Sequence, residues 1–465
     1  MNAPVIWILL PLGASGLFWL LRRLRNIATL GGTFALLLAG VATFIPIDLA
    51  LRIGPWSFKI APALDFLGRR LVLSPEKQPL LPLIYGLVAI WFFGARAAAM
   101  GQRLIPFGLA ITALLIASLA VEPFLYAAMF IEIAVLLAVP MLTSPSHPAT
   151  RGAIRFLIYQ TLAMPFILLA GWLLPGVEAS PGDLALAVES AALLGLGFAF
   201  LLAIFPLYTW IPLLTEEAPP YLVGFLLWLL PTVILFFGLG FLDRYSWLRT
   251  SQQLPDALRL AGLLMVTTGG VWSALQRHLG RMMGYAAIAE SGLMLLSLTL
   301  ELPTGIETAF LFLIPHAFGL ALWVLALTTM ATQGWPLHLD QVRGAFRRYP
   351  LAATALILAQ LSTAGFPLLA GFPPRLALLE GMAHQSLAAT FWLLTGMLGL
   401  LLAAIRVTFT LSASPAGTAW EWRETGMQRV LLGLGTIFIF AIGLFPQIVH
   451  PLLVNLPAIF EHLGR

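Results

Sequence analysis

The sequence predicts an all-α polytopic membrane protein with about fourteen transmembrane helices. Of its 465 residues, 60% are hydrophobic and only 10% are charged, a composition that no soluble domain of this size has. Apolar runs long enough to cross a bilayer, about 20 residues each, recur along the whole chain with short connections. Short connections favour antiparallel neighbours in one compact bundle.

Fourteen apolar runs are the expected membrane spans. The first run starts without a basic region or a small-residue cleavage site, which favours a retained span over a signal peptide. The absence of cysteine excludes a disulfide framework, a thiolate metal site and a cysteine nucleophile. We place the spans at residues 4–21, 27–48, 79–99, 104–121, 123–142, 153–174, 186–212, 219–242, 257–275, 281–300, 307–330, 351–381, 386–412 and 427–449.

One connection, residues 49–78, is much longer than the others. Over residues 56–60, aromatic and aliphatic side chains alternate with polar ones, which is typical of a short surface strand. We therefore expect a small extramembrane hairpin or lid here, kept in water by its charged residues, which are Asp65, Arg69, Arg70, Glu76 and Lys77.

The lysines and arginines predict the orientation of the bundle. With fourteen spans, fourteen of the 25 basic residues fall on one side of the membrane and nine on the other. Five of those nine lie in the long connection, which the positive-inside rule weights less. We expect the side with fourteen to be cytoplasmic, so that both termini face outside.

A first prolyl break interrupts the stretch 197–232. Its apolar run meets Pro206 and Pro212, passes through two acids, and reaches Pro219 before it turns apolar again. Proline removes a backbone donor and clashes with the preceding turn, so we expect a broken helix. In lipid such a break is tolerated only where protein or a water-filled cavity satisfies the freed groups, as at the ion sites of transporters. An ordinary loop between two spans is the alternative.

A second break, residues 365–375, contains Gly365, Pro367 and Gly371. The two breaks fall in the seventh and twelfth spans, and this offset of five suits two inverted five-helix repeats, helices 4–8 and 9–13. The expected organisation is an N-terminal unit with three helices and the long connection, a first repeat, a second repeat, and a C-terminal helix with its tail, at residues 1–103, 104–242, 257–412 and 413–465.

Two carboxylates lie deep inside apolar runs. Glu132 is in the fifth span and Glu290 at a similar depth in the tenth, so the repeats predict them as related positions. A carboxylate at mid-bilayer costs several kcal/mol unless it is hydrated, paired or protonated. Such a group suits the uptake and release of protons. The alternatives are a protonated acid that only ties helices together and, for Glu290, a structural hydrogen bond to Ser291 or to a neighbouring helix.

Two basic groups accompany these acids. Arg375 ends the second break; because arginine stays protonated, it can orient water or hold a carboxylate but is a poor proton carrier. It belongs to the polar axis or forms a structural ion pair with Glu380. His316 lies mid-span, and imidazole titrates near neutral pH, which suits a relay. A helix contact is the alternative for His316.

Three further charged residues carry weaker signals. Arg406 lies within an apolar run and either pairs with an acid or extends toward the membrane surface. Glu216 and Glu217 lie at the first break, where they form an entrance or are solvated loop acids.

Other classes of chemistry have no support in the sequence. It has no nucleophile elbow, no HExxH motif and no phosphate-binding glycine loop. The formal net charge of +5 is spread between apolar runs, without the long basic tract of a nucleic-acid binder. The 14 tryptophans are explained by interfacial belts and packing. We expect no metal and no redox cofactor on this chain.

Several motifs together resemble one family. FPLYTWIPLLTEEAP, residues 205–219, resembles the FPxHxWLPDAxxxAP stretch of the antiporter-like subunits L, M and N of respiratory NADH:quinone oxidoreductase, complex I. Residues 281–292 are similar to its KRLLAYSSIAHxG, residues 365–375 to its GxPPLAGFxxK, and His316 begins a match to HALxKA. Glu132 falls where the family has its fifth-helix glutamate. Subunit N is nearest in length, and Mrp-type antiporter and membrane-bound hydrogenase subunits are related.

The departures from the family concern its lysines. Lysine occurs only at Lys59 and Lys77, so no expected span contains one. By the resemblance, the proton-path lysines of the family align with Leu201, Thr232, Leu320, Gly280 and Arg375, the aspartate of its WLPDA motif with Leu213, and its FP-x-His histidine with Tyr208.

The resemblance implies a membrane-arm subunit that couples quinone reduction in partner subunits to proton translocation, with a degenerate lysine relay. Glu132, Glu290, His316 and Arg375 would line its proton path. NADH, FMN, Fe–S clusters and quinone are expected only in partners, which are other membrane-arm subunits within the bilayer of a bacterial inner membrane. The alternatives are a non-conducting structural or assembly subunit, and a cation/proton antiporter or bicarbonate-uptake subunit of the same fold.

Overall fold

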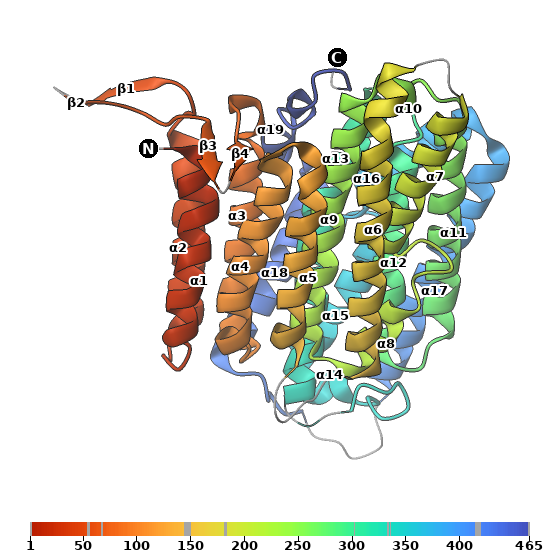
Figure 1. The fold of residues 1–465 in the computed structure, drawn as a ribbon. Coiled ribbons are helices and arrows are strands. Elements are labelled where there is room, and N and C mark those ends of the chain that lie inside the picture. The colour runs from red at the N-terminus through yellow and green to blue at the C-terminus, as the bar shows by residue number, and fades with distance from the viewer. Residues whose placement is uncertain are drawn as a thin grey trace.

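The computed structural model of the chain describes residues 2–53, 56–66, 68–143, 150–180, 184–301, 303–332, 334, 336–413 and 420–463. Long helices run side by side as one bundle, and the N- and C-terminal ends lie at the same end of it (Figure 1). Among the described residues, ten helices are long and apolar enough to cross a membrane. Each of the fourteen predicted runs coincides with a helix or a pair of helices, so the all-α polytopic fold is confirmed.

The helices follow the chain in two sets. The first set, which a π-helical stretch at Val5–Leu9 precedes, is α1 (Leu10–Leu20), α2 (Ile27–Phe44), α3 (Leu80–Ala97), α4 (Gly101–Ala120), α5 (Ala127–Leu142), α6 (Arg151–Ala179), α7 (Leu184–Leu201), α8 (Trp210–Glu217) and α9 (Pro220–Arg244). The second is α10 (Ser246–Arg249), α11 (Gln253–Leu275), α12 (Leu279–Ser297), α13 (Thr304–Thr332), α14 (Ala345–Arg348), α15 (Pro350–Thr363), α16 (Phe372–Gln385), α17 (Leu387–Ser412), α18 (Gly426–Leu444) and α19 (His450–Leu453).

The long connection between α2 and α3 forms two antiparallel hairpins. β1 (Ala50–Ile53) pairs with β2 (Trp56–Lys59), and β3 (Ala63–Phe66) pairs with β4 (Arg69–Val72), to which β5 (Val121–Glu122) adds. The predicted strand is therefore confirmed as β2. Gly54, Pro55, Leu67 and the side chains of residues 51–58 lie outside the described part, so the predicted alternation stays a prediction.

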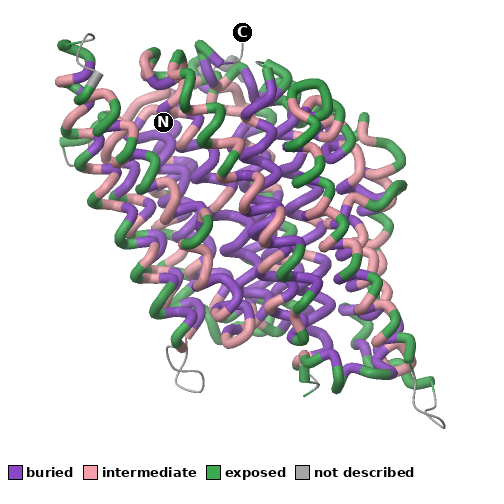
Figure 2. The backbone as a smooth tube through the Cα atoms, turned by 90° about the vertical axis from the view of Figure 1, so that its right-hand side faces the viewer, coloured by how far each residue is buried: buried purple, intermediate pink, exposed green. Residues whose placement is uncertain are grey.

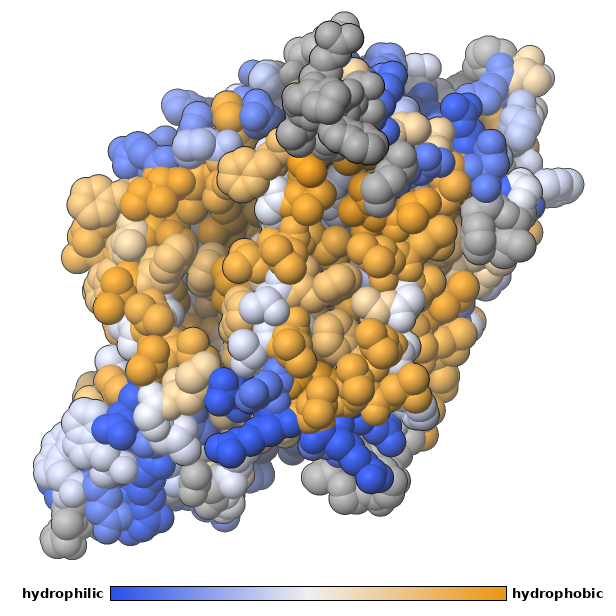
Figure 3. Space-filling view, turned by 90° about the vertical axis from the view of Figure 1, so that its left-hand side faces the viewer, coloured by the Kyte–Doolittle hydropathy of each residue, from blue (hydrophilic) through white to orange (hydrophobic). Residues whose placement is uncertain are grey.

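Burial separates central helices from peripheral ones. In α4 and α9, 89% of the most apolar window is buried, whereas in α18 only 22% is buried. Figure 2 shows the buried positions concentrated along the middle of the bundle and the exposed ones along its outer helices and both ends. The face in Figure 3 has an apolar band between two hydrophilic ends. Such a band is what a lipid environment requires, because water would strongly disfavour it.

Both predicted helix breaks are present. Between α7 and α8 the chain leaves the helix over residues 202–209, which include Pro206, and Ala203 has φ +55°. Between α15 and α16 it leaves the helix over residues 364–371, with Gly365 at φ +80°. Prolines then stand in the first turn of α16, where a missing N–H leaves no intrahelical bond unmade.

The two broken spans run in opposite directions. In Figure 1, α7 lies toward the upper end of the bundle and α8 toward the lower, whereas α15 lies toward the lower end and α16 toward the upper. Inverted repeats require this arrangement. The predicted limits of the repeats, 104–242 and 257–412, stay a prediction, as do the limits of the terminal units.

Candidate functional site

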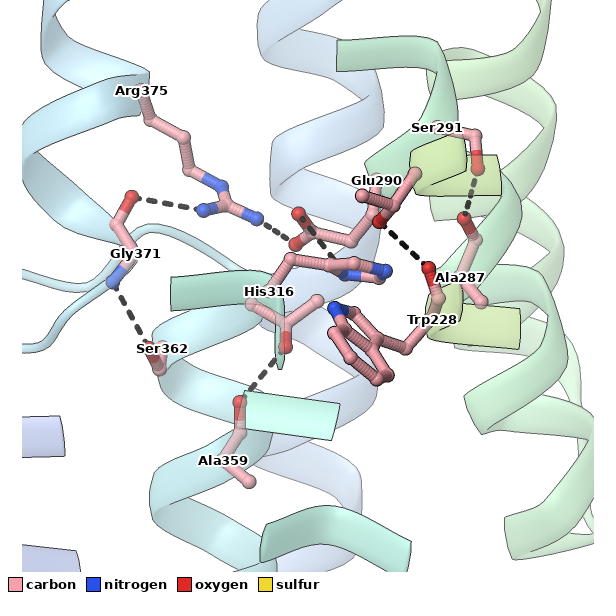
Figure 4. A network of polar contacts seen from close by, with 11 residues as sticks. Trp228, Ala287, Glu290, Ser291, His316, Ala359, Ser362, Gly371 and Arg375 are labelled. Carbon is pink, nitrogen blue, oxygen red and sulfur yellow. Dashed lines mark hydrogen bonds and ion pairs between the residues drawn. The ribbon is translucent and has the colours of Figure 1, made fainter. Parts of the chain in front are cut away.

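A buried carboxylate forms the centre of a polar cluster inside the bundle. Glu290, on α12, is 5% exposed. Arg375, on α16, donates from Nη2 to its Oε1, and the Nδ1 atom of His316, on α13, lies 3.8 Å from its Oε2. Figure 4 shows the three side chains converging from three different helices. The structure thus brings together three of the four predicted proton-path residues.

The second helix break holds Arg375 in place. Its Nη1 donates to the carbonyl of Gly371 over 2.8 Å, and the Gly371 N–H donates to the Ser362 hydroxyl over 3.0 Å. Gly365 lies against the same side chain, since a Cβ there would come within 2.5 Å of Arg375 Cδ. The ring of Phe312 lies 5.5 Å from the guanidinium carbon. The break therefore satisfies part of its own freed backbone with the arginine that it positions.

A second proline places a carbonyl beside His316. Pro231 lies inside α9 and has no N–H, so the carbonyl of Leu227, one turn earlier, has no donor within the helix. The ring of His316, which is 6% exposed, lies beside the Leu227 backbone. His316 therefore lies between the Glu290 carboxylate and a carbonyl that the helix leaves free.

A small cavity adjoins this cluster. It has a volume of about 10 Å³ and is lined by Glu290, His316 and Arg375 together with Leu320 and Ser362. That volume approaches the room one water molecule needs. The Nε atom of Arg375 is buried and has no hydrogen-bond partner among the described residues. A carboxylate, an imidazole and a small polar cavity together can exchange a proton.

The fourth predicted proton-path residue lies apart from this cluster. Glu132, on α5, is half-buried, and its Oε1 accepts a hydrogen bond of 2.8 Å from the Thr161 hydroxyl on α6. Leu201, at the end of α7, is buried at 5% exposure. Thr232 donates to the Trp228 carbonyl over 2.7 Å. Leu201 and Thr232, two of the positions where the resemblance would put lysines, thus carry no side chain that can take up and release a proton.

Two pairings that the sequence left open as alternatives are absent. Arg375 does not pair with Glu380, which is exposed, but with Glu290 on another helix. Glu290 does not hydrogen-bond to Ser291 either, because the Ser291 hydroxyl donates to the Ala287 carbonyl over 3.2 Å. For Arg375 the sequence suggested a neighbour along the chain, and packing between helices supplied a different partner. For Glu290 the partner lies on a neighbouring helix, which was the other alternative.

The acids of the first break have contacts at the end of the bundle. Glu216 forms a 2.6 Å ion pair with Arg281 at the start of α12. Glu217 accepts a 2.7 Å hydrogen bond from the Gly152 N–H in the first turn of α6, where a carboxylate stabilises the helix N-terminus. Arg406 donates to the carbonyl of Gln276 over 3.3 Å and so caps the end of α11.

The loop before α12 contains a titratable cap. The Nδ1 atom of His278 accepts a 3.2 Å hydrogen bond from the Gly280 N–H. Burial lowers the pKa of His278, and the neighbouring charge of Glu216 opposes that shift. The neutral ring is therefore the form that caps the helix, because only an unprotonated Nδ1 can accept.

Three residues of functional interest carry little or no signal in the sequence. Ser362 supports the Arg375 loop, while Gln160 and Trp210 border the first break. Gln160 had a signal, since an amide inside an otherwise apolar run is unusual. Ser362 and Trp210 are common in such runs and gave none. Among the described residues, no group of three or more His, Asp or Glu could hold a metal ion.

A family model and a relative of known name both match most of this chain. The family model described as NADH:quinone oxidoreductase/Mrp antiporter, TM, matches residues 129–403. The NADH-quinone oxidoreductase subunit N of Cereibacter sphaeroides is 29% identical over 339 residues, which are 69% of this chain and 71% of that protein.

Solved structures share the fold. A chain of the membrane-bound sulfane sulfur reductase, an archaeal respiratory membrane complex, has a TM-score of 0.82 at 18% identity and covers 100% of this chain and 99% of its own. A chain of the Mrp complex from Dietzia sp. has a TM-score of 0.80 at 18% identity, covering 99% and 97%. Both likenesses extend over essentially the whole bundle.

Proposed function

We propose, from the premise that this chain belongs to the NADH:quinone oxidoreductase/Mrp antiporter transmembrane family, that it is the antiporter-like membrane-arm subunit of a complex I-like enzyme. Quinone reduction in partner subunits drives proton translocation through it. The observation that carries the proposal is the buried Glu290, held between Arg375 and His316. A bundle that served only as a scaffold has no need of a carboxylate at this cost.

The cluster has the groups that proton exchange requires. Arg375 keeps its positive charge and balances Glu290 while the carboxylate is ionised. When Glu290 takes up a proton, Arg375 loses its counter-charge, so the protonated state differs in electrostatic energy from the ionised state. The proton moves between Glu290 and His316, whose Nδ1 atom lies 3.8 Å from the Oε2 atom of the carboxylate.

Glu132 is the proposed outer acid of the same path. It is half-buried at the surface of the bundle and keeps one oxygen in a hydrogen bond with Thr161. A partly exposed acid exchanges protons with water or with a neighbouring subunit more readily than a fully buried one. We place proton exchange with the exterior of the subunit at Glu132 and internal storage at Glu290.

The redox chemistry belongs to partners in this proposal. The Cereibacter relative is by name a subunit of NADH-quinone oxidoreductase, and both solved neighbours are chains of multi-subunit complexes. We propose that NADH, FMN, Fe–S clusters and quinone bind only to other subunits, and that this chain associates with membrane-arm partners and with lipid. It has no role with nucleic acid.

We further propose a bacterial inner membrane as its location, with both termini outside. The ends of the chain lie at one end of the bundle (Figure 1), as an even number of spans requires. The opposite side carries the larger number of arginines.

Proton pumping by the purified parent complex in liposomes tests the function. In Glu290→Gln, the protons translocated per NADH oxidised should fall while the complex stays assembled. Glu380→Gln is the matched control, because Glu380 is an exposed acid on the same helix as Arg375. An unchanged number of protons per NADH in Glu290→Gln would favour a non-conducting structural subunit. The presence of Leu201 where the family has a proton-path lysine would agree with that result.

A further inference from the structure

Four arginines gather at the lower end of the bundle in Figure 1, where α1 turns into α2. Arg22, Arg23 and Arg25 lie in the turn itself and are exposed. Arg96, near the end of α3, donates from Nη1 to the Thr29 hydroxyl over 3.3 Å and so reaches the first turn of α2. We call these four arginines the arginine patch. Because α1 and α2 lie at one edge of the bundle, the patch is at its rim.

Carboxylates do not balance this patch. Residues 1–47 contain no aspartate or glutamate, and neither do residues 78–121, which include α3 and α4. Among the residues that the structure describes, no ion pair involves any of the four arginines. Four guanidinium groups without a counter-charge produce a positive potential around them, which favours an anionic ligand.

An apolar surface begins within one helical turn of the arginines. Leu17 and Leu20, three residues apart on α1, lie on one face of that helix and are 57% and 71% exposed. On α2, Leu30 and Leu37 are exposed as well. This edge of the bundle faces the viewer in Figure 3, where the apolar band meets a hydrophilic lower end. A ligand here therefore meets positive charge at one end and hydrocarbon beside it.

Two apolar side chains mark the level of the membrane surface. The guanidinium carbon of Arg22 lies 4.8 Å from the centre of the Trp19 ring. This cation–π contact orients the arginine side chain, while the N–H groups at the edge of the guanidinium plane stay available to a ligand. Leu24 lies between Arg23 and Arg25 and is 46% exposed. Tryptophan prefers the membrane–water interface, and lipid covers an exposed leucine at lower cost than water does.

We propose that the arginine patch binds the phosphate group of an anionic phospholipid, whose acyl chains lie along the exposed faces of α1 and α2. In addition to their charge, guanidinium groups recognise phosphate through paired N–H···O bonds. A phospholipid also has its two parts in the order that this edge requires, a negative head group followed by hydrocarbon. Basic clusters directly beside membrane-spanning helices recognise anionic lipids for this reason.

A soluble anion or an acidic protein surface fits this edge less well. Free phosphate would use the arginines and leave Leu17, Leu20 and Leu24 uncovered. An acidic segment of a partner would have to bury the same leucines beside its own charges, and charged residues are depleted in the apolar core of protein interfaces. A phospholipid satisfies both the charged and the apolar part of the surface.

Lipid binding to the purified full-length chain in detergent micelles tests this inference. Native mass spectrometry compares the retention of phosphatidylglycerol with that of phosphatidylcholine, both with the same acyl chains. The wild type should retain phosphatidylglycerol in preference. In Arg22→Gln/Arg25→Gln, that preference should fall about thirtyfold, the factor that two basic residues beside an anionic lipid supply. Arg22→Lys/Arg25→Lys keeps both charges and should keep most of the preference.

The matched control is Arg151→Gln/Arg155→Gln. Both arginines are exposed in the first turns of α6, at the same end of the bundle. The Glu217 carboxylate reaches this helix end, where it accepts from the Gly152 N–H, so a counter-charge is already present. The variant removes the same charge at a distance from the arginine patch and should retain phosphatidylglycerol as the wild type does.

Three results would overturn the lipid site. The first is an equal preference for phosphatidylglycerol in the wild type and in Arg22→Gln/Arg25→Gln. The second is loss of the bound lipid on addition of excess inorganic phosphate, which would assign the patch to a soluble anion. The third is a map of the parent complex with a protein segment over this edge. All three report binding, so none depends on whether the chain translocates protons.

Discussion

Arg375 and Glu290 form an ion pair between residues 85 positions apart in the sequence. Both side chains are almost fully buried, at 2% and 5% exposure. The pair joins α16, the second half of a broken span, to α12. In such a pair each charge depends on the other, because neither has water to replace the partner.

Removal of the arginine alone should therefore be severe. Arg375→Met leaves the Glu290 charge unpaired, and we expect a loss of about 3–5 kcal/mol in the free energy of unfolding. The double variant Arg375→Met/Glu290→Gln should recover a large part of that loss. Denaturant titration of the purified protein in mixed micelles measures both values. A loss in Arg375→Met no larger than in Arg406→Met, which removes a partly exposed cap, would contradict this account.

A methyl group at position 365 should displace the arginine. Gly365 has φ +80°, and an added Cβ would come within 2.5 Å of Arg375 Cδ. Gly365→Ala should cost about 1–3 kcal/mol for the left-handed backbone alone. Gly433→Ala is the control, since a Cβ there meets nothing within 4 Å and α18 should tolerate it. The same unfolding titration compares the two; equal stabilities would show that the loop adapts freely.

The ion pair at the end of the bundle should matter far less. Glu216 and Arg281 have side chains that are 29% and 37% exposed. Solvent screens such a pair, so Glu216→Gln should change the free energy of unfolding by at most about 1 kcal/mol. Raising the salt concentration should reduce even that difference. A salt-independent effect of several kcal/mol would show that this pair acts as part of the buried network.

The cap at His278 should make the start of α12 sensitive to pH. Burial lowers the pKa of His278 in the folded chain below its ordinary value of about 6.5, which the unfolded chain keeps. Between these two pKa values, the unfolded chain binds a proton at His278 and the folded chain does not. Stability should thus fall as the pH decreases from about 6.5 toward that lowered value. The charged neighbours are Glu216, which opposes the shift, and His338 and Arg281, which add to it.

Hydrogen exchange at the backbone of Leu279 and Leu339, which bond to Leu337 and Arg277 across this loop, measures the effect. After correction for the intrinsic pH dependence of the chemistry, the exchange rate of these two amides should rise as the pH decreases below about 6.5. His278→Asn keeps a side-chain acceptor at the cap but does not titrate, so it should remove that response. A response that persists in His278→Asn would assign it to another group.

The sequence predicts the broken helices well because their causes are local. Pro206 and Gly365 act on the backbone at their own positions, and no distant contact can restore the missing N–H or supply the missing Cβ. The strand over residues 56–59 is predicted for the same reason, since alternation is a property of adjacent residues.

Partners across helices could not be predicted in the same way. Spacing along α16 suggested Glu380 for Arg375, but the distance between α16 and α12 decides the true partner, and no local pattern encodes it. The polar side chains of Gln160 and Trp210 lie far apart in the sequence, and only the folded α7–α8 break brings them to the wall of one cavity. Such groupings of buried polar side chains become visible only in the folded bundle.

The central claim is that Glu290 takes up and releases a proton while the complex turns over. Infrared difference spectroscopy of the parent complex, recorded as NADH is added, reports protonation changes of individual carboxyl groups. The account predicts a carboxylic-acid band that is present in the wild type and in Glu380→Gln and is missing in Glu290→Gln. Identical difference spectra for the wild type and Glu290→Gln would contradict it and show that this carboxylate keeps one protonation state throughout.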